Sequence, residues 1–230
     1  MPRQREAELM DDPGLDPAEH GRALAGLARI NRFSGGAGAL WPALAKLARA
    51  GRPIRALDVA TGSGDLPVAL ARLAKRAGLP LELAGCDISP VAVAAAQERA
   101  AAAGVTVRFF RHDVLATPLP TGFDAVFCSL FLHHLDEPEA AALLRSMGLA
   151  AGRLVLVNDL ARSRRNLAMV WLACRALSRS PVVHADGPRS VRAAYTPAEA
   201  LALAARAGLT GATVAGRFPC RYLLEWRRPT

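Results

Sequence analysis

Apolar positions follow two periods along this chain, one typical of buried strands and one typical of amphipathic helices. Short apolar runs occupy residues 54–59, 81–86, 105–110, 123–129 and 153–157. Between them, apolar residues recur at helical spacing over residues 66–77, 90–103 and 138–149. This alternation predicts an α/β fold, a doubly wound and mostly parallel sheet with helices on both faces.

The last part of the chain predicts one more helix and two more strands. Thr196, Pro197 and Glu199 form a capping pattern, and the helix that they begin should stop at Gly208. Two further apolar runs, 212–218 and 221–226, are separated by a Pro-Cys pair. We expect them to form an antiparallel hairpin at the sheet edge, which brings the sheet to seven strands.

Two segments lie outside the strand–helix repeat. Residues 1–50 look helical around 22–30 and 40–50, and we expect an N-terminal helical cap, with 30–36 as a glycine-hinged lid. Residues 160–195 form a long connection after the fifth strand with a helix of its own near 166–177. Additions at the carboxyl ends of strands usually build the ligand crevice, so this insert should face the substrate. Residues 51–230 would form the main domain.

The stretch LDVATGSGD places a Gly-x-Gly turn between a strand and a helix, the context that a nucleotide-binding loop requires. A dinucleotide fingerprint would have Gly or Ala where this chain has Pro67, and no lysine follows Gly64, which excludes a P-loop. The carboxylates of Asp58 and Asp65 flank the turn and would repel a pyrophosphate. They favour a ligand with positive charge and no phosphate, such as S-adenosylmethionine. A nucleotide-dependent reductase is the weaker alternative.

Acidic residues also end the next two predicted strands. Asp87 follows Gly62 by 25 residues, where a carboxylate can accept both ribose hydroxyls, and Asp113 is placed to accept the adenine amino group. The simpler interpretations are a helix-capping turn at Asp87 and an ordinary turn at Asp113. Acids at the ends of three successive strands favour the binding role for each of them.

Composition narrows the function classes. The net charge is +9, and 27 of the 29 basic residues are arginines. These arginines are scattered along the chain, apart from Arg162, Arg164 and Arg165, so the composition does not favour a nucleic-acid partner. The chain has 48 alanines, no apolar run long enough to span a membrane, and four widely spaced cysteines. We expect a cytoplasmic protein without zinc or disulfides; monomer and homodimer stay open.

The stretches LDVATGSGD, GCDISPVAVAAA, RHDVLATPLPTGFDAVFCSLFLHHLDE and RLVLVND together resemble class I S-adenosylmethionine-dependent methyltransferases over residues 54–160. The resemblance implies a Rossmann-like fold with residues 51–230 as the methyltransferase domain. The form DVATGSGD looks like the quinone-biosynthesis members, so Ala60, where the family commonly has glycine, does not indicate loss of binding. The segment from Asn158 to Thr196 looks like small bacterial enzymes that methylate phenolic or polyketide-like metabolites.

The resemblance also assigns cofactor residues by position. The methionine portion of S-adenosylmethionine would lie against the turn after the first strand and the end of the fourth, the ribose at the second strand and the adenine at the third. The residues concerned are Asp58, Ala60, Gly62, Gly64, Ser129 and Leu130 for the methionine, Asp87 with Ile88 for the ribose, and Asp113 with Val114 for the adenine.

Methyl transfer to a hydroxyl needs alignment, exclusion of water and a base with a pKa near neutrality, which favours histidine. His133 and His134 follow the fourth strand, and one of them is the candidate base; equally, the pair could only shape the loop. His184 is a second candidate. Strand four ends in Ser129-Leu130-Phe131-Leu132 without metal ligands, so we expect no metal. No polar-Pro-Pro-aromatic turn follows it, which argues against DNA adenine methylation.

Substrate contacts should come from the two added segments and from the end of the fifth strand. The candidates are Arg32, Asn158, Arg162, Trp171, His184 and Tyr195. An apolar helix face is more often core than pocket, and an arginine cluster is more often solvated. The favoured function is O-methylation of a small, apolar, hydroxylated molecule. The alternatives are C-methylation of a quinone precursor and a non-catalytic cofactor-binding protein of the same fold.

Overall fold

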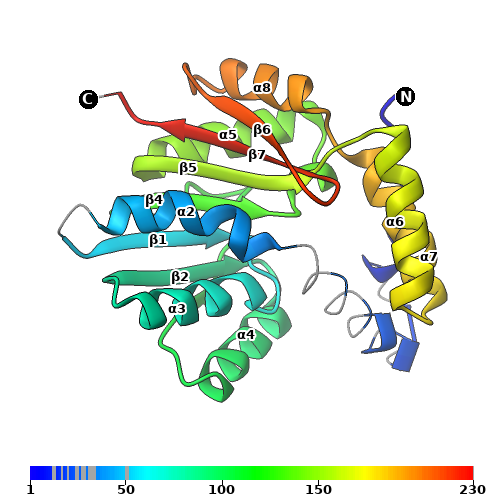
Figure 1. Ribbon diagram of the computed structural model, residues 1–230, viewed down its shortest axis with the longest axis horizontal. Helices are drawn as coiled ribbons and strands as arrows, with labels where there is room; N and C mark the ends of the chain where they lie inside the picture. The colour runs from blue at the N-terminus through cyan, green and yellow to red at the C-terminus, as the bar shows by residue number, and fades with distance from the viewer. Residues whose placement is uncertain are drawn as a thin grey trace.

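The computed structural model describes residues 1–11, 14–16, 18–19, 21–23, 26, 30, 35–49 and 52–229. In this part of the chain, seven strands form one sheet in the order β3-β2-β1-β4-β5-β7-β6 (Figure 1). The strands are β1 (Ile54–Val59), β2 (Leu81–Asp87), β3 (Arg108–Arg111), β4 (Phe123–Ser129), β5 (Ala151–Leu160), β6 (Thr213–Arg217) and β7 (Arg221–Arg227). β1 to β5 run parallel and β7 is antiparallel to both β5 and β6, which confirms the predicted fold.

Helices cover both faces of the sheet, as the doubly wound pattern requires. On one face lie α2 (Gly36–Ala48), α3 (Asp65–Ala77) and α4 (Pro90–Ala102), and on the other α5 (Glu137–Ala150) and α8 (Pro197–Arg206). Neighbouring residues of β4 alternate between the two cores: Phe127 packs with the first set of helices, and Val126 and Cys128 with the second. Both faces are therefore apolar, which explains the continuous runs in the sequence.

Side-chain caps set the starts of two helices where the sequence predicted them. Thr196 and Glu199 exchange the two hydrogen bonds of a capping box at α8, and Asp136 with Glu139 does the same at α5. The third strand is shorter than expected, because residues 105–107 lie before β3, while β5 continues to Leu160. None of the helices in the described part of the chain is long and apolar enough to cross a bilayer.

The insert after β5 holds two helices where the sequence predicted one. α6 (Arg164–Leu177) is the expected helix, but Pro181–Ala193 forms α7, although Asp186-Gly187-Pro188 looks like a turn. Tertiary packing overrides that local signal. A Cβ at Gly187 would lie 2.3 Å from Cys174 Sγ and 3.2 Å from Val170 Cγ1, so the glycine permits α6 and α7 to pack closely.

The helical cap expected over residues 1–50 stays a prediction: the described positions 21–23, 26 and 30 are helical and α2 follows at 36–48, but the first eight residues are not helical. Residues 1–8 have no regular structure and run along α7 and the short helix η2 (Leu132–His134) before the turn η1 (Leu9–Asp11). Gln4 N donates to Arg192 O, and the backbone amides of Leu9 and Met10 donate to Asp186. The expected lid over 30–36 falls largely on residues outside the described part, as does most of the expected helix over 22–30.

Candidate active site

The turn after β1 contains three left-handed backbone conformations. Ala60, Gly62 and Gly64 have φ of 54°, 54° and 74°, and α3 begins at the next residue. Glycine adopts this region without steric cost, whereas a Cβ is strained there. The glycine that the family commonly has at position 60 therefore meets a backbone requirement, which Ala60 meets at a cost of about 1–2 kcal/mol.

The two glycines of the turn have different surroundings. A Cβ at Gly62 would meet nothing within 4 Å, so the space beside it is open. A Cβ at Gly64 would lie 2.8 Å from Ala96 Cβ and 2.9 Å from Phe109 Cζ. Gly62 therefore leaves room for a ligand, while Gly64 permits the turn to pack against α4 and β3.

Asp58 is the acid at the base of this turn. Its side chain is buried, and Oδ2 accepts a hydrogen bond from Thr61 Oγ1 at 2.7 Å. Burial raises the pKa of Asp58 to about 8; the Thr61 hydrogen bond works against this rise, and the nearby charge of Asp87 adds to it. A cationic group placed beside Asp58 would favour its ionised form.

Asp87 connects the glycine turn to the end of β2. Its Oδ2 accepts from Gly62 N at 2.8 Å and its Oδ1 from Ser89 N at 3.0 Å. The N-cap of α4 is Ser89 and not Asp87. Each carboxylate oxygen can accept a further hydrogen bond, as two ribose hydroxyls would require. The neighbouring Ile88 exposes its side chain at the same strand end.

Asp113 and Val114 follow β3. Asp113 Oδ1 accepts from the backbone amides of Leu115 and Ala116, both at 3.0 Å, so this carboxylate closes a turn. Val114 is half-buried against the core beneath α5. Asp113 therefore does stabilise a turn, and the expectation that Asp113 and Val114 contact the adenine stays a prediction.

The end of β4 places Ser129 and Leu130 at the same edge of the sheet. Leu130 has a φ of 56°, the second strained non-glycine residue at a strand end, and its amide donates to Asn158 O. Ser129 Oγ accepts from Asn158 Nδ2 at 2.9 Å. Strained residues gather at functional sites because the surrounding structure holds them in place.

The residues at this edge fit S-adenosylmethionine. Asp58, Asp87 and Asp113 lie at or just after the carboxyl ends of three neighbouring strands, and the space beside Gly62, whose amide donates to Asp87, is open. Such a set suits a ligand with ammonium, sulfonium and ribose hydroxyl groups, and it disfavours a phosphate. When bound there, S-adenosylmethionine would supply a methyl group activated by its sulfonium.

Beyond β4, His133 forms a buried pair with Asp159 of β5. His133 Nδ1 lies 2.7 Å from Asp159 Oδ1, and the His133 backbone amide donates to Oδ2 at 3.2 Å. Burial by itself would lower the pKa of His133, but the charge and hydrogen bond of Asp159, with Glu8 adding to them, raise it above its ordinary value. Burial by itself would raise the pKa of Asp159, but the charge and the hydrogen bond of His133 outweigh burial and lower it.

His134 has a different environment although it is the next residue. Its ring is tilted against that of His133, with the centroids 4.2 Å apart. Burial, followed by the charge of His133, lowers the pKa of His134 to about 4. At neutral pH His134 is therefore an uncharged imidazole and a weak base, which separates the two histidines that the sequence left equivalent.

Both histidines line a cavity of about 380 Å³ that the beginning of the chain covers. Its other lining residues are Arg5, Glu6, Ala7, Glu8 and Ala193. Glu8 Oε1 lies 3.9 Å from His133 Nε2, and Ser190 Oγ donates to the same carboxylate. Within the described residues, Glu8, His133 and His134 are the one group close enough together to hold a metal ion, with ligand atoms within 4.8 Å. Metal-free chemistry stays a prediction.

Two predicted substrate residues are engaged in holding the fold together. Arg162 is buried, and it donates to Ala194 O, to Met1 O and to the carboxylate of Glu199. Tyr195 is buried, and its hydroxyl donates to Leu135 O at 2.9 Å while the Arg3 guanidinium covers its ring. The structure gives these side chains partners within the protein, and the substrate role expected of them stays a prediction.

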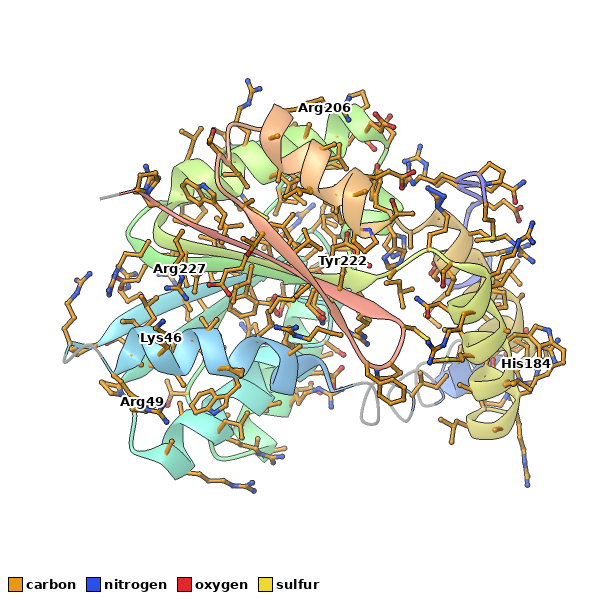
Figure 2. The ribbon with its side chains drawn as sticks, turned by 45° about the horizontal axis from the view of Figure 1, so that its top comes forward. Lys46, Arg49, His184, Arg206, Tyr222 and Arg227 are labelled. Atoms are coloured by element: carbon orange, nitrogen blue, oxygen red, sulfur yellow. The ribbon has the colours of Figure 1, made fainter. Side chains whose placement is uncertain are left out.

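The remaining residues predicted to contact the substrate lie on different elements. His184 lies on the outer part of α7, well away from Tyr222 in the sheet (Figure 2), and its Nε2 contacts Ser178 O at 2.7 Å. Trp171 faces outward on α6. Asn158 is fully buried, and its Oδ1 has no partner among the described residues, which leaves an acceptor for a ligand donor. Arg32 lies outside the described residues.

Two residues of this site were not predicted from the sequence, namely Asp159 as the partner of His133 and Glu8 beside it. Asp159 ends a predicted strand next to Asn158, so an acid at a strand end was the available signal. Glu8 carried none, because only the tertiary structure brings residues 1–8 over the histidines.

Comparisons with known proteins identify the domain that contains this edge of the sheet. The profile of a methyltransferase domain matches residues 56–150. Demethylmenaquinone methyltransferase from Thermus thermophilus is 40% identical over 108 residues, which cover 46% of this chain and 47% of that protein. The matched part is thus about half the length of the curated relative.

Two solved structures share the fold. The S-adenosylmethionine-dependent methyltransferase SibL superposes with a TM-score of 0.68 at 21% identity, over 99% of this chain and 64% of that chain. The plantazolicin methyltransferase BpumL, in complex with SAH, gives 0.69 at 14% identity, over 94% and 91%. The matched profile therefore shows a methyltransferase domain over residues 56–150, and the chain shares its fold with these two methyltransferases.

Proposed function

We propose that this protein transfers the methyl group of S-adenosylmethionine to a hydroxyl of a small, apolar, phenolic or polyketide-like molecule. The observation that supports this most is the buried His133–Asp159 pair beside the cavity. Asp159 holds Nδ1 of His133, which leaves Nε2 on the side of Glu8, a lining residue. An imidazole oriented by a carboxylate is suited to take a proton.

In this proposal the acceptor O–H bond breaks as the proton passes to His133 Nε2. S-adenosylmethionine held by Asp58 and Asp87 would supply the methyl group, which the acceptor oxygen would receive as the bond from the methyl carbon to sulfur breaks, with S-adenosylhomocysteine as the second product. Asp159 stabilises the imidazolium that results. His134 lines the same cavity and, with its lowered pKa, does not compete for the proton.

The second candidate is methylation of a ring carbon in a quinol. The demethylmenaquinone methyltransferase from Thermus thermophilus, 40% identical over 108 residues, favours it. Removal of a proton is needed there as well, so His133 serves either reaction. The products separate the two candidates, since one is a methoxy compound and the other carries a methyl group on the ring.

The test is incubation with isotopically labelled S-adenosylmethionine and a panel of phenols and quinols, followed by mass spectrometry of the products. We expect label in a methoxy group and a kcat that falls roughly 10²–10⁴-fold in His133→Ala. His134→Ala is the matched control and should lose much less. Cofactor binding without any labelled product would instead favour a non-catalytic binding protein.

A further inference from the structure

The outward face of α6 is an apolar stripe with arginines at both ends. Only Cys174 of this helix is buried, since α6 packs against α7 and not on the sheet. Trp171 and Leu172 at its centre are 45% and 60% exposed. The exposed positions continue at helical spacing over the length of the helix, and Arg179 just beyond its end is exposed as well. The positions are Arg164, Arg165, Ala168, Trp171, Leu172, Arg175, Ala176 and Arg179.

The tip of the β6–β7 hairpin extends this face. Phe218 is 85% exposed, and Arg217 beside it is exposed as well. The hairpin tip is directed toward α6 (Figure 1), and the two elements line a common cavity of about 290 Å³. Its lining includes Arg165, Asn166 and Met169 from the helix side and Arg217, Phe218 and Cys220 from the hairpin. We name the stripe together with Arg217 and Phe218 the α6 surface.

The charge of the α6 surface is of one sign. Residues 161–185 contain five arginines and no acidic residue. No ion pair joins any arginine of the α6 surface to a residue in the described part of the chain. The guanidinium of Arg175 lies 3.8 Å above the Trp171 ring, which keeps a cation next to the apolar centre. Elsewhere many arginines pair with carboxylates, so this positive charge remains uncompensated locally.

We propose that the α6 surface docks on the headgroup region of an anionic lipid bilayer. A helix that exposes Trp and Leu between arginines matches the interfacial helices that lie in the plane of a membrane. Trp favours this region because its ring is apolar and its N–H is polar. Each arginine near an anionic lipid surface strengthens binding roughly fivefold.

A nucleic acid fits the same arginines less well. The centre of the stripe consists of Leu172 and two alanines besides Trp171, which offer a strand no series of rings for stacking. The docking proposal does not depend on which acceptor the enzyme methylates. It does place α6 against the membrane. This helix begins four residues after the end of β5, near the edge of the sheet where the proposed acceptor site lies.

The experiment is co-sedimentation of the full chain with vesicles, at low and at high salt. One set of vesicles contains equal parts of phosphatidylglycerol and phosphatidylcholine, and the other phosphatidylcholine alone. We expect salt-sensitive binding to the anionic vesicles and weak binding to the neutral ones. Trp171 should also be quenched by brominated lipids, which Trp171→Phe would abolish.

Variants with matched controls locate the surface. Leu172→Ser with Phe218→Ser should weaken binding about tenfold or more, whereas Val91→Ser on α4, at a position 77% exposed, should leave it unchanged. Arg175→Gln with Arg179→Gln should weaken it about twentyfold, and Arg72→Gln with Arg76→Gln on α3 much less. Thermal unfolding checks that each variant folds.

Absence of vesicle binding by the native chain would overturn the proposal. Equal losses in the α6 variants and their controls would overturn it too, because the contact would then lie elsewhere. Binding to duplex DNA or RNA that the α6 variants abolish, with no binding to vesicles, would assign the surface to nucleic acid instead. Methyl transfer is not measured in any of these arms, so failure of the function proposed above would not affect them.

Discussion

Replacement of Asp159 by asparagine should reveal how much the buried pair with His133 contributes to stability. Asparagine keeps the size of the side chain and removes the charge. In the native protein the raised pKa of His133 stabilises the fold fully below its ordinary value of 6.5, and this contribution is lost as pH rises through the folded pKa. The lowered pKa of Asp159 contributes above 3.8 and is lost as pH falls through its folded value.

The effect of Asp159→Asn therefore depends on pH with a defined sign. Between the two ordinary values both groups are charged in the folded protein, and loss of one partner from a buried pair costs about 3–5 kcal/mol. Above the folded pKa of His133 its imidazole is neutral, and the remaining loss is that of a hydrogen bond to a charged group, about 1.5–3 kcal/mol. The destabilisation should shrink as pH rises.

Urea unfolding of both proteins, one pH unit below 6.5 and well above it, measures this difference. Asp65→Asn is the control, since Asp65 pairs with Arg99 at 2.9 Å on the surface, where such pairs contribute about 0–1 kcal/mol. A loss of stability in Asp159→Asn that is independent of pH, or no larger than in Asp65→Asn, would refute the reasoning.

Three further predictions concern the cofactor side. Asp87→Ala should weaken S-adenosylmethionine binding by about 1.5–3 kcal/mol in calorimetric titration, and unchanged affinity would contradict the ribose assignment. Because the pKa of Asp58 is raised to about 8, the protein without ligand should lose stability as pH rises from 3.8 toward that value, and binding of the cationic cofactor near neutral pH should release a proton. The binding enthalpy then varies with the ionisation enthalpy of the buffer, and a buffer-independent enthalpy would argue against it. Ala60→Gly should stabilise the fold by up to about 1 kcal/mol in thermal unfolding, since relief of the strained φ exceeds the entropy cost of glycine; a clear loss of stability would show that Ala60 is not strained.

Local patterns predicted the parts of the fold that depend on neighbouring residues. The capping box at Thr196 and Glu199 and the buried runs of β1 and β4 carry their own signals, and they appear at or near the predicted positions. α7 was missed because its Gly187 and Pro188 have a turn composition, and only the close approach of α6 explains why the helix continues through them.

In the candidate site, too, some residues could be predicted from local patterns and others could not. The acids at the ends of β1, β2 and β3 were predictable, because parallel strands bring their carboxyl ends to one edge of the sheet and a strand end is visible in the sequence. The distinction between His133 and His134 was not, since it arises from Asp159, 26 positions along the chain from His133. The partners of Arg162 and Tyr195 were not predictable for a related reason, because they are chain-distant backbone carbonyls and Glu199.

By itself, the sequence determined the strand–helix alternation, the glycine turn with its acids and hence the class of cofactor, because each of these depends on residue types at short spacing. The tertiary structure alone decided which side chains are neutralised, which are buried without a partner and which face outward. Glu8 lies over the histidines and Trp171 lies on the surface because distant segments pack, and packing energies between distant segments leave no periodic trace along the chain.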